Sequence, residues 1–158
     1  MLPLLVALTA SWGASQPPAC PDTGPLTVTT LCLINELRSA VGAPRLRLDP
    51  RLSRVARRHA DDMVRNHYFS HTSPTGLTVS DRVARSGWMR GRRHWAVGET
   101  LAWWTRPARP ETIVRAWLRS HAHRTVMLRR RYRVVGIGIA PGTPAGRPGR
   151  TYTANFGS

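Results

Sequence analysis

The sequence predicts an α+β domain in which most helices precede the strands. Apolar residues recur at helical spacing over the first two thirds of the chain and at strand spacing over the last third, with one strand pattern in between. A length of 158 residues corresponds to one domain with a sizeable core. Hydrophobic residues at 41% and charged residues at 20% are typical of globular chains, which excludes a disordered protein.

The first predicted helix covers residues 26–41, where apolar side chains three or four positions apart precede a glycine and a proline that end it. Residues 46–48 are expected to form a short extended link. Asp49 and Pro50 have the residue types of an N-cap and a first helical position, so a second helix is expected to run to about His67. One face of this second helix carries the predicted core residues Leu52, Val55, Ala56, His59, Ala60 and Met63.

Two further helices are predicted after a turn at residues 73–76. Thr78 and Asp81 have the spacing of a capping box, which predicts a third helix ending at Gly87. Pro110 begins the fourth helix, and the glutamate after it suits the helix dipole. The residues predicted to share one face of the fourth helix are Val114, Trp117, Leu118 and His121.

Three strands are predicted. Residues 97–103 fit a strand, residues 134–139 have the apolar pattern of a buried strand, and residues 151–156 alternate like a half-buried strand. The segment 141–149 is rich in proline and glycine and is predicted to be a turn. The last two strands are therefore expected to form an antiparallel hairpin that closes the domain.

The chain is strongly basic, with 24 basic residues, all of them arginine, against 8 acidic ones. Its positive charge persists at any ordinary pH. The arginines opposite the apolar face of the second helix are Arg51, Arg54, Arg58 and Arg65, and a second cluster comprises residues 129–131 and Arg133. These side chains either form a solvated shell or bind anionic envelope polymers or phospholipid head groups. Nucleic acid is not an expected partner, because no nucleic-acid motif is visible and aromatic residues are not interleaved with the basic runs.

The N-terminal segment has the pattern of an export signal. Residues 2–10 are apolar but too few to span a bilayer, and small residues follow them. This pattern predicts a signal peptide of about residues 1–15 and hence a secreted or envelope-associated protein. The alternative is an apolar, disordered N-terminus on a cytosolic protein. No apolar run reaches the length of about 18 residues that indicates a transmembrane helix, so none is predicted.

The chain has two cysteines, Cys20 and Cys32. In an exported protein they most simply form one disulfide, which would tie an N-terminal arm of residues 16–25 to the first helix. Such a loop contributes about 2–3 kcal/mol by restricting the unfolded chain. The alternative, two buried free thiols, is favoured only if the protein is not exported. Residues 26–158 form the predicted domain.

Three polar residues are candidates for a functional site: His71, Glu99 and His123. His71 precedes the proline turn, Glu99 interrupts an apolar strand, and His123 follows the predicted fourth helix. If these edges meet, the two imidazoles and the carboxylate could hold a divalent metal with an open position for water, or act as general acid and base. The alternative is a structural hydrogen-bonded network that joins helices to the sheet. Their spacing matches no short metal motif.

The other candidate residues have simpler interpretations. His59 faces the core side of its helix and is predicted to be a buried histidine with satisfied hydrogen bonds. The histidines expected on the surface or in packing contacts are His67, His94 and His121. The tryptophans expected in the core, or alternatively in the wall of a ligand groove, are Trp103, Trp104 and Trp117. No nucleophile motif is present, so a serine or cysteine nucleophile is unsupported.

Five segments occur in an order that resembles the CAP superfamily of cysteine-rich secretory proteins, antigen 5 and pathogenesis-related proteins. The segments are FSHTSPTG, VGETLAWW, AWLRSHAHRTVML, VVGIGIA and YTANFG. LCLINELRSAVGAPRLRLDPRL and HADDM also look like the first two helices of that family. The resemblance covers about residues 26–158 and is strongest to the single-domain, SCP-like extracellular proteins of bacteria.

This resemblance implies an α-β-α sandwich with a central antiparallel sheet, and a cleft that holds two histidines and two acids. By motif, His71 matches the first histidine, Glu99 the glutamate and His123 the second histidine. The remaining acid would fall at Ser120, so one acid is missing and a weaker or absent metal site follows. His121 is a candidate replacement ligand, although its predicted position on the helix favours packing.

Members of the family are variously linked to lipid or sterol binding, defence, secreted toxins and proteolysis, so membership alone does not decide the function. Our first hypothesis is a secreted, non-enzymatic binding module for a lipid or an envelope component. The second is a hydrolase that uses zinc or another divalent cation on His71, Glu99 and His123. The third is a basic adhesin for anionic envelope polymers. The lack of a nucleophile disfavours a peptidase, and of the three hypotheses we favour the one in which the protein is not an enzyme.

Overall fold

A computed structural model describes residues 20, 21 and 23–158. The predicted signal peptide of residues 1–15 and the first residues of the arm lie outside the described residues. The helices are α1 (Leu26–Ala40), α2 (Pro50–Arg65), α3 (Val79–Arg85), α4 (Pro110–Arg119) and α5 (His121–Met127). The strands are β1 (Arg47–Leu48), β2 (Val97–Thr105), β3 (Val134–Pro141) and β4 (Gly149–Gly157).

The strands of the described residues form one sheet in the order β1-β3-β4-β2. β4 is antiparallel to both β2 and β3, so the predicted closing hairpin of β3 and β4 is confirmed. Residues 46–48, predicted to be only a link, include the edge strand β1, which pairs in parallel with β3. The sheet is therefore mixed at this one edge and antiparallel elsewhere.

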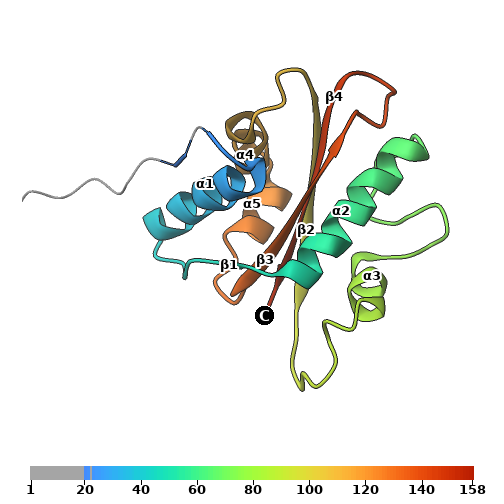
Figure 1. Cartoon of the computed structure of the whole chain (residues 1–158). Helices are drawn as coiled ribbons and strands as arrows, with labels where there is room; N and C mark the ends of the chain where they lie inside the picture. Colours follow the sequence, from blue (N-terminus) through green and yellow to red (C-terminus); the bar gives the residue numbers. More distant parts are fainter. Residues whose placement is uncertain (1–19, 22) are drawn as a thin grey trace, which may run out of the picture.

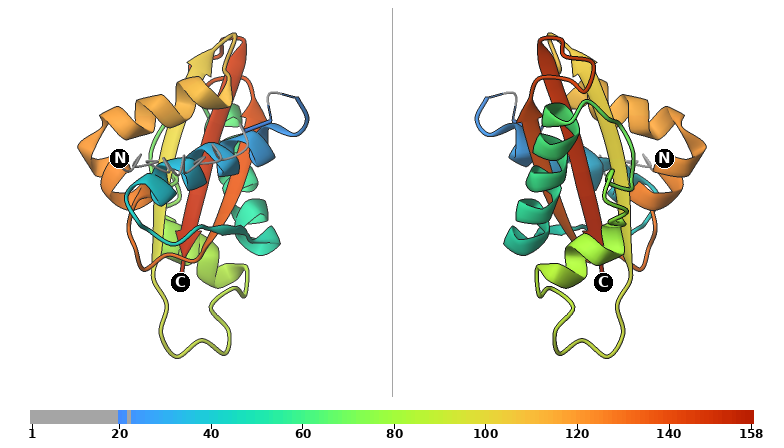
Figure 2. Two further views of the ribbon diagram at one scale, coloured as in Figure 1. Left: turned by 90° about the vertical axis from the view of Figure 1, so that its left-hand side faces the viewer. Right: turned by 90° about the vertical axis from the view of Figure 1, so that its right-hand side faces the viewer.

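Helices cover both faces of the sheet, as Figure 1 shows. α1, α4 and α5 lie on one side, and α2 and α3 lie on the other; the two side views in Figure 2 show each cover in turn. This arrangement confirms the α-β-α sandwich. Within the part of the chain that the structure describes, no helix is long and apolar enough to cross a membrane.

The face toward α1, α4 and α5 carries the larger apolar core. Side chains on alternate positions of β4, Tyr152, Ala154 and Phe156, pack there with the fully buried Trp117. The prediction that β4 is half-buried was wrong: Thr151 to Gly157 are all buried, because helices cover both faces of this central strand. The prediction that Trp104 lies in the core was also wrong, since it is 47% exposed near the end of the edge strand β2.

The opposite face brings α2 unusually close to β3. A Cβ atom on Gly136 would lie 2.0 Å from the carbonyl carbon of Leu52, and one on Gly138 would lie 2.1 Å from the backbone nitrogen of Arg57. These two glycines let the helix backbone rest directly on the strand. The six residues predicted for the core face of α2 are all buried: Leu52, Val55, Ala56, His59, Ala60 and Met63.

Two of the predicted helix starts are confirmed by their caps. The Asp49 carboxylate accepts hydrogen bonds from the backbone N–H groups of Arg51 and Leu52 at the start of α2. Thr78 and Asp81 form the predicted capping box of α3. Because these caps satisfy otherwise free N–H groups, the local sequence was sufficient to place both starts.

The region after α4 differs from the prediction. The backbone leaves helical geometry at Ser120 (φ −82°, ψ 122°), and a separate helix, α5, begins at His121. His121 therefore does not share the apolar face of α4; it is exposed. The Ser120 hydroxyl accepts a hydrogen bond from the backbone N–H of His123 at 3.5 Å and caps α5.

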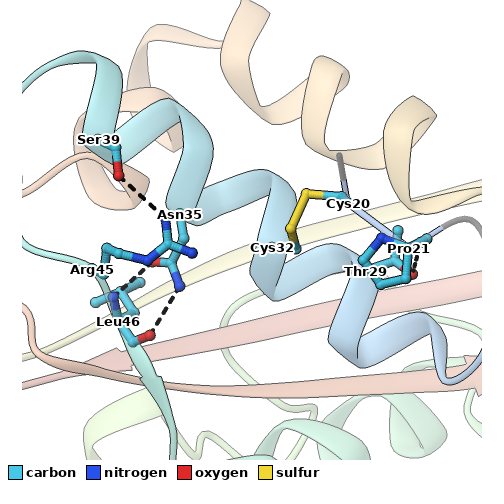
Figure 3. The surroundings of a disulfide bond; sticks show 8 residues. All are labelled: Cys20, Pro21, Thr29, Cys32, Asn35, Ser39, Arg45 and Leu46. Atoms are coloured by element: carbon cyan, nitrogen blue, oxygen red, sulfur yellow. Dashed lines mark hydrogen bonds between the residues drawn. A yellow bond between two sulfur atoms is a disulfide. The ribbon is translucent and has the colours of Figure 1, made fainter. Parts of the chain in front are cut away.

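The structure contains the disulfide between Cys20 and Cys32, with the two Cα atoms 5.6 Å apart (Figure 3). It holds the N-terminal arm against α1, where the Thr29 hydroxyl also donates to the Pro21 carbonyl at 2.7 Å. Farther along α1, the Asn35 amide exchanges two hydrogen bonds with the backbone of Leu46 (Figure 3). These contacts tie α1 to both of its chain neighbours.

Candidate functional site

Glu99 is the centre of the candidate site. It lies on β2 on the side of the sheet that α2 covers, and its side chain is only 1% exposed. Its placement follows from the alternation of the strand, because Gly98 faces the other layer, where Tyr132 and Val126 pack. A buried carboxylate is costly unless it is paired and hydrogen-bonded, so its partners define the site.

Arg82 of α3 is the main partner of Glu99, and sequence reasoning missed it. Its Nη2 donates to both carboxylate oxygens, at 3.0 Å to Oε1 and 2.8 Å to Oε2. Its Nη1 donates to the carbonyls of His71 and Leu77, at 2.9 and 2.8 Å. The guanidinium thus fixes the carboxylate and the loop before α3 at once. Its Nε is buried and has no partner within the described residues.

His71 is brought to Glu99 as the site hypothesis requires. Its Nδ1 lies 2.9 Å from Oε1 of Glu99. Because the carboxylate oxygen is an acceptor, Nδ1 is assigned as the donor, which leaves Nε2 as the unprotonated nitrogen of the neutral ring. The side chain is 54% exposed, and Nε2 has no hydrogen-bond partner among the described residues. His71 therefore presents a fixed imidazole to the surface.

His123 reaches the same region from α5. Burial lowers the pKa of His123, and the charge of nearby His71 lowers it further, so the two imidazoles share one electrostatic environment. Ser120, which stands at the position of the missing acid, caps α5 and fixes the backbone of His123. The serine therefore has a positioning role in the structure that does not need a carboxylate.

Two more residues support Glu99 from behind. With its amide assigned so that the nitrogen faces the carboxylate, Asn155 of β4 donates to Oε2 at 2.9 Å. His59 of α2 is buried as predicted, and its Nε2 lies 3.0 Å from the Ser70 carbonyl and 3.9 Å from Oε1 of Glu99. Burial lowers the pKa of His59 more than Glu99 raises it. This histidine is therefore neutral and structural, but it belongs to the wall of the site.

Tyr68 extends this wall. Its hydroxyl donates to Oδ2 of Asp62 at 2.5 Å and lies 3.4 Å from Nδ1 of His59. Burial, and then the hydrogen bond to Asp62, raise the pKa of Tyr68 above its ordinary value. The phenol is thus held as a proton donor and does not supply a base.

The donor set limits how a metal could bind. Arg82, His71 and Asn155 already occupy both oxygens of Glu99, and a cation there would face the guanidinium. The nitrogens that remain for a metal are Nε2 of His71 and the ring of His123, with Glu99 orienting His71 from behind. Among the described residues, the only three His, Cys, Asp or Glu side chains with ligand atoms within 4.8 Å of one another are Cys20, Cys32 and Glu36, and these cysteines are disulfide-bonded.

Comparisons with known proteins identify the family of this chain. The model of the cysteine-rich secretory protein family, CAP, matches residues 31–156. The protein YkwD of Bacillus subtilis is 32% identical over 106 residues, which cover 67% of this chain and 39% of that protein. The membrane protein YlbC of the same species is 30% identical over 126 residues, which cover 80% of this chain and 32% of that protein. The chain thus spans well under half the length of these curated relatives.

Solved structures agree with the fold. An extracellular SCP-domain protein from Bacillus anthracis superimposes with a TM-score of 0.67 at 31% identity, over 80% of this chain and 38% of that chain. An outer surface protein of Borrelia burgdorferi has a TM-score of 0.71 at 22% identity, over 87% of this chain and 96% of that chain. The first likeness extends to sequence, and the second concerns the fold alone.

Proposed function

This chain belongs to the cysteine-rich secretory protein family, and on that premise we propose that it is an exported, non-enzymatic protein that binds a lipid of the cell envelope. The observation that carries the non-enzymatic part of this proposal is the hydrogen bonding of the Glu99 carboxylate. Its carboxylate is buried and both oxygens are engaged by Arg82, His71 and Asn155. A carboxylate that acts as a general base needs a free oxygen within reach of a substrate proton, and Glu99 has none.

Export is supported by two features. The Cys20–Cys32 disulfide is of the kind that persists outside the reducing cytosol. One structural neighbour is described as an extracellular protein and another as an outer surface protein. Together with the apolar segment at residues 2–10, these features support a site of action outside the cytoplasm.

The lipid ligand is supported by a groove between α1 and α4. It has a volume of about 440 Å³, and its lining is mainly apolar, with carboxylates of Glu36 and Glu111 and one arginine at its sides. The apolar residues along it are Leu33, Leu37, Ala40, Val114 and Leu118. A concave, largely apolar groove of this size suits a hydrocarbon chain. It lies across the sheet from Glu99, so lipid binding and the polar site are structurally separate.

The test is a titration of the purified chain with a fluorescently labelled long-chain fatty acid. Leu37→Gln places a polar group in the groove, and we expect it to weaken binding about tenfold or more. Val28→Gln is the matched control, because Val28 is an exposed residue of α1 outside the groove, at 45% exposure. No binding by the folded wild type, or equal losses in both variants, would contradict the proposal. A loss confined to His71→Ala/His123→Ala would overturn the groove as the binding place.

A metal-dependent hydrolase at His71, Glu99 and His123 remains the second candidate, favoured by the exposed imidazole of His71 with a carboxylate behind it. Zinc titration by calorimetry on the wild type and on His71→Ala/His123→Ala distinguishes it. Tight one-to-one binding that the double variant abolishes would support the hydrolase. The control His67→Asn/His94→Ala removes two exposed histidines elsewhere; asparagine is chosen for His67 because its φ is 53°. A folded wild type that takes up no zinc rejects this candidate.

A further inference from the structure

Arginine side chains converge on the outer side of α2 from two separate segments. One set lies on α2 itself, opposite its buried face, and the other lies on α3 and the loop that follows it. The exposed members are Arg51, Arg54, Arg58, Arg65, Arg85, Arg90 and Arg92. Figure 1 shows α3 and that loop beside α2, on the side of the sheet away from α1 and α4. The set is therefore distinct from the proposed lipid groove.

The surface between these arginines is hollowed along the helix. A cavity of about 490 Å³ lies near the start of α2, between Arg51, Arg54, Arg90 and Arg92. A cavity of about 180 Å³ follows beside Arg58 and Arg85, and one of about 520 Å³ beside Arg58 and Arg65. The second and third cavities share lining residues, and neighbouring residues of α2 line the first and second. The three cavities form what we call the α2 groove.

Most of the charge in the α2 groove is not neutralised. The two acids along it are already bound, Asp49 by Trp88 and two backbone N–H groups, and Asp62 by Tyr68 and Asn66. Within the described residues, five guanidinium groups have no acceptor: Arg54, Arg58, Arg65, Arg85 and Arg90.

A neighbouring arginine shows that this is not a general property of α2. Arg57, on the adjacent side of the same helix, pairs with Asp61 at 2.9 Å. These five arginines of the α2 groove thus lack acidic partners in the described residues, whereas Arg57 beside the groove has one. Free, clustered guanidinium groups in a hollowed surface are suited to phosphate recognition.

The shape of the α2 groove indicates a long ligand. Arg51 and Arg65 are fourteen positions apart on one helix, which corresponds to about 21 Å at the rise of an α-helix. Arginines between them, at positions three, four and seven apart, provide contacts along this length. A single phosphate would engage only part of it, whereas a linear polymer with regularly spaced phosphates would engage all of it.

The α2 groove offers little for bases to stack on. Its tryptophan, Trp88, is only 3% exposed, and the guanidinium of Arg92 lies 4.1 Å from the centre of its ring. Proteins that bind single-stranded nucleic acid combine basic grooves with aromatic stacking platforms, which this groove lacks in the described residues. We therefore propose that the α2 groove binds a linear phosphodiester polymer without bases, of the poly(glycerol phosphate) type.

Salt-dependent binding of a fluorescently labelled poly(glycerol phosphate), long enough to span the α2 groove, tests this proposal on the full chain. If the five free arginines each neutralise one phosphate, the logarithm of the binding constant should fall with the logarithm of salt concentration with a slope of about −3.5. The variant Arg54→Gln/Arg58→Gln/Arg85→Gln should bind about tenfold or more weakly, and its slope should be smaller in magnitude by about 2.

The matched control is Arg129→Gln/Arg131→Gln/Arg147→Gln, which removes three exposed arginines outside the α2 groove and lowers the net charge equally. It should keep most of the affinity and the slope. Equal losses in the two variants would show that only net charge matters and would overturn the proposal, as would no binding by the wild type. Tighter binding of single-stranded DNA of the same charge, lost in the same groove variant, would overturn the choice of a polymer without bases.

Discussion

The two faces of the sheet are built by different means. On the face toward α1, α4 and α5, alternate residues of β4 are large and apolar, and they pack around Trp117. On the face toward α2, the intervening residues of β4 are Thr151, Thr153 and Asn155, and β3 contributes Gly136 and Gly138. The first face obtains its stability from apolar burial, which is insensitive to direction. The second has a smaller apolar cluster of Leu52, Val55, Val83 and Trp88, and it adds a close backbone approach and the hydrogen-bonded partners of Glu99.

This difference explains why the candidate site lies on the second face. A buried carboxylate could not exist among Tyr152, Phe156 and Trp117, which offer few polar partners. Beside α2, Glu99 finds Arg82, His71 and Asn155. Removing one hydrogen-bonded partner on the polar face should therefore lower the free energy of unfolding more than breaking one exposed contact elsewhere.

The largest effect is expected from removing Arg82. Arg82→Leu leaves the carboxylate of Glu99 buried without its main partner, and we expect it to lower the free energy of unfolding by about 3–5 kcal/mol. Urea denaturation measures this loss. The matched control is Arg57→Leu, which breaks an exposed ion pair with Asp61, with side chains 53% and 32% exposed. The control should lose only about 0.2–1 kcal/mol.

A double variant sharpens this test. Arg82→Leu/Glu99→Gln removes the buried charge together with its partner, so it should be more stable than Arg82→Leu alone. Equal stability of the double and single variants would mean that Arg82 acts through packing or through the loop carbonyls of His71 and Leu77. A loss for Arg82→Leu no larger than that for Arg57→Leu would contradict the contrast between the faces.

A smaller effect is expected on the other side of the molecule. The Cys20–Cys32 disulfide closes a loop with a sequence separation of 12. Cys20→Ser/Cys32→Ser should lower the free energy of unfolding by about 2–3 kcal/mol through the freer unfolded chain. Because the disulfide lies in the α1 layer, across the sheet from the α2 groove, the variant should leave polymer binding in that groove unchanged while the fold persists. A loss of the fold itself would show that the rest of the domain does not fold stably without this disulfide.

The smallest effect is a pH dependence at the polar face. Burial lowers the pKa of His59 from its ordinary value of 6.5, so below that pH the unfolded chain binds more protons than the folded one. The free energy of unfolding should therefore fall as the pH falls from about 6.5 through the lower pKa of the folded state. His123 contributes in the same direction.

Urea unfolding between neutral pH and about pH 5 measures this slope. His59→Gln should reduce it, even though the variant is less stable overall, while His94→Gln on the surface should not. An unchanged slope in His59→Gln would mean that other groups carry the acid sensitivity.

Local patterns predicted much of this molecule. The apolar face of α2, the Asp49 cap, the capping box of Thr78 and Asp81, and the closing hairpin all depend on neighbours within a few positions or on simple alternation. Most roles that depend on partners distant in the sequence were not predicted by these local patterns. The break at Ser120 is one example. The sequence alone does not distinguish a serine inside a helix from a serine that ends one helix and caps the next.

Two arginines make the same point. Among 24 arginines, no local pattern singles out Arg38, which is fully buried and donates to carbonyls of Pro44, Met127, Arg129 and Tyr132. Nor does any local pattern single out Arg82, which holds Glu99. Both act through groups supplied by other segments of the chain, so their roles appear only when those segments meet.

The sequence by itself determined the order and type of most elements, the family resemblance, and the candidates His71, Glu99 and His123. These follow from residue periodicity, capping chemistry and ordered motifs, which are local properties of the chain. Only the tertiary structure decided that Glu99 is already occupied by Arg82, that Ser120 caps a separate helix, and that free arginines line one groove beside α2. Burial and hydrogen-bond partners are properties of the packed chain, and they decide which polar groups remain available to a ligand.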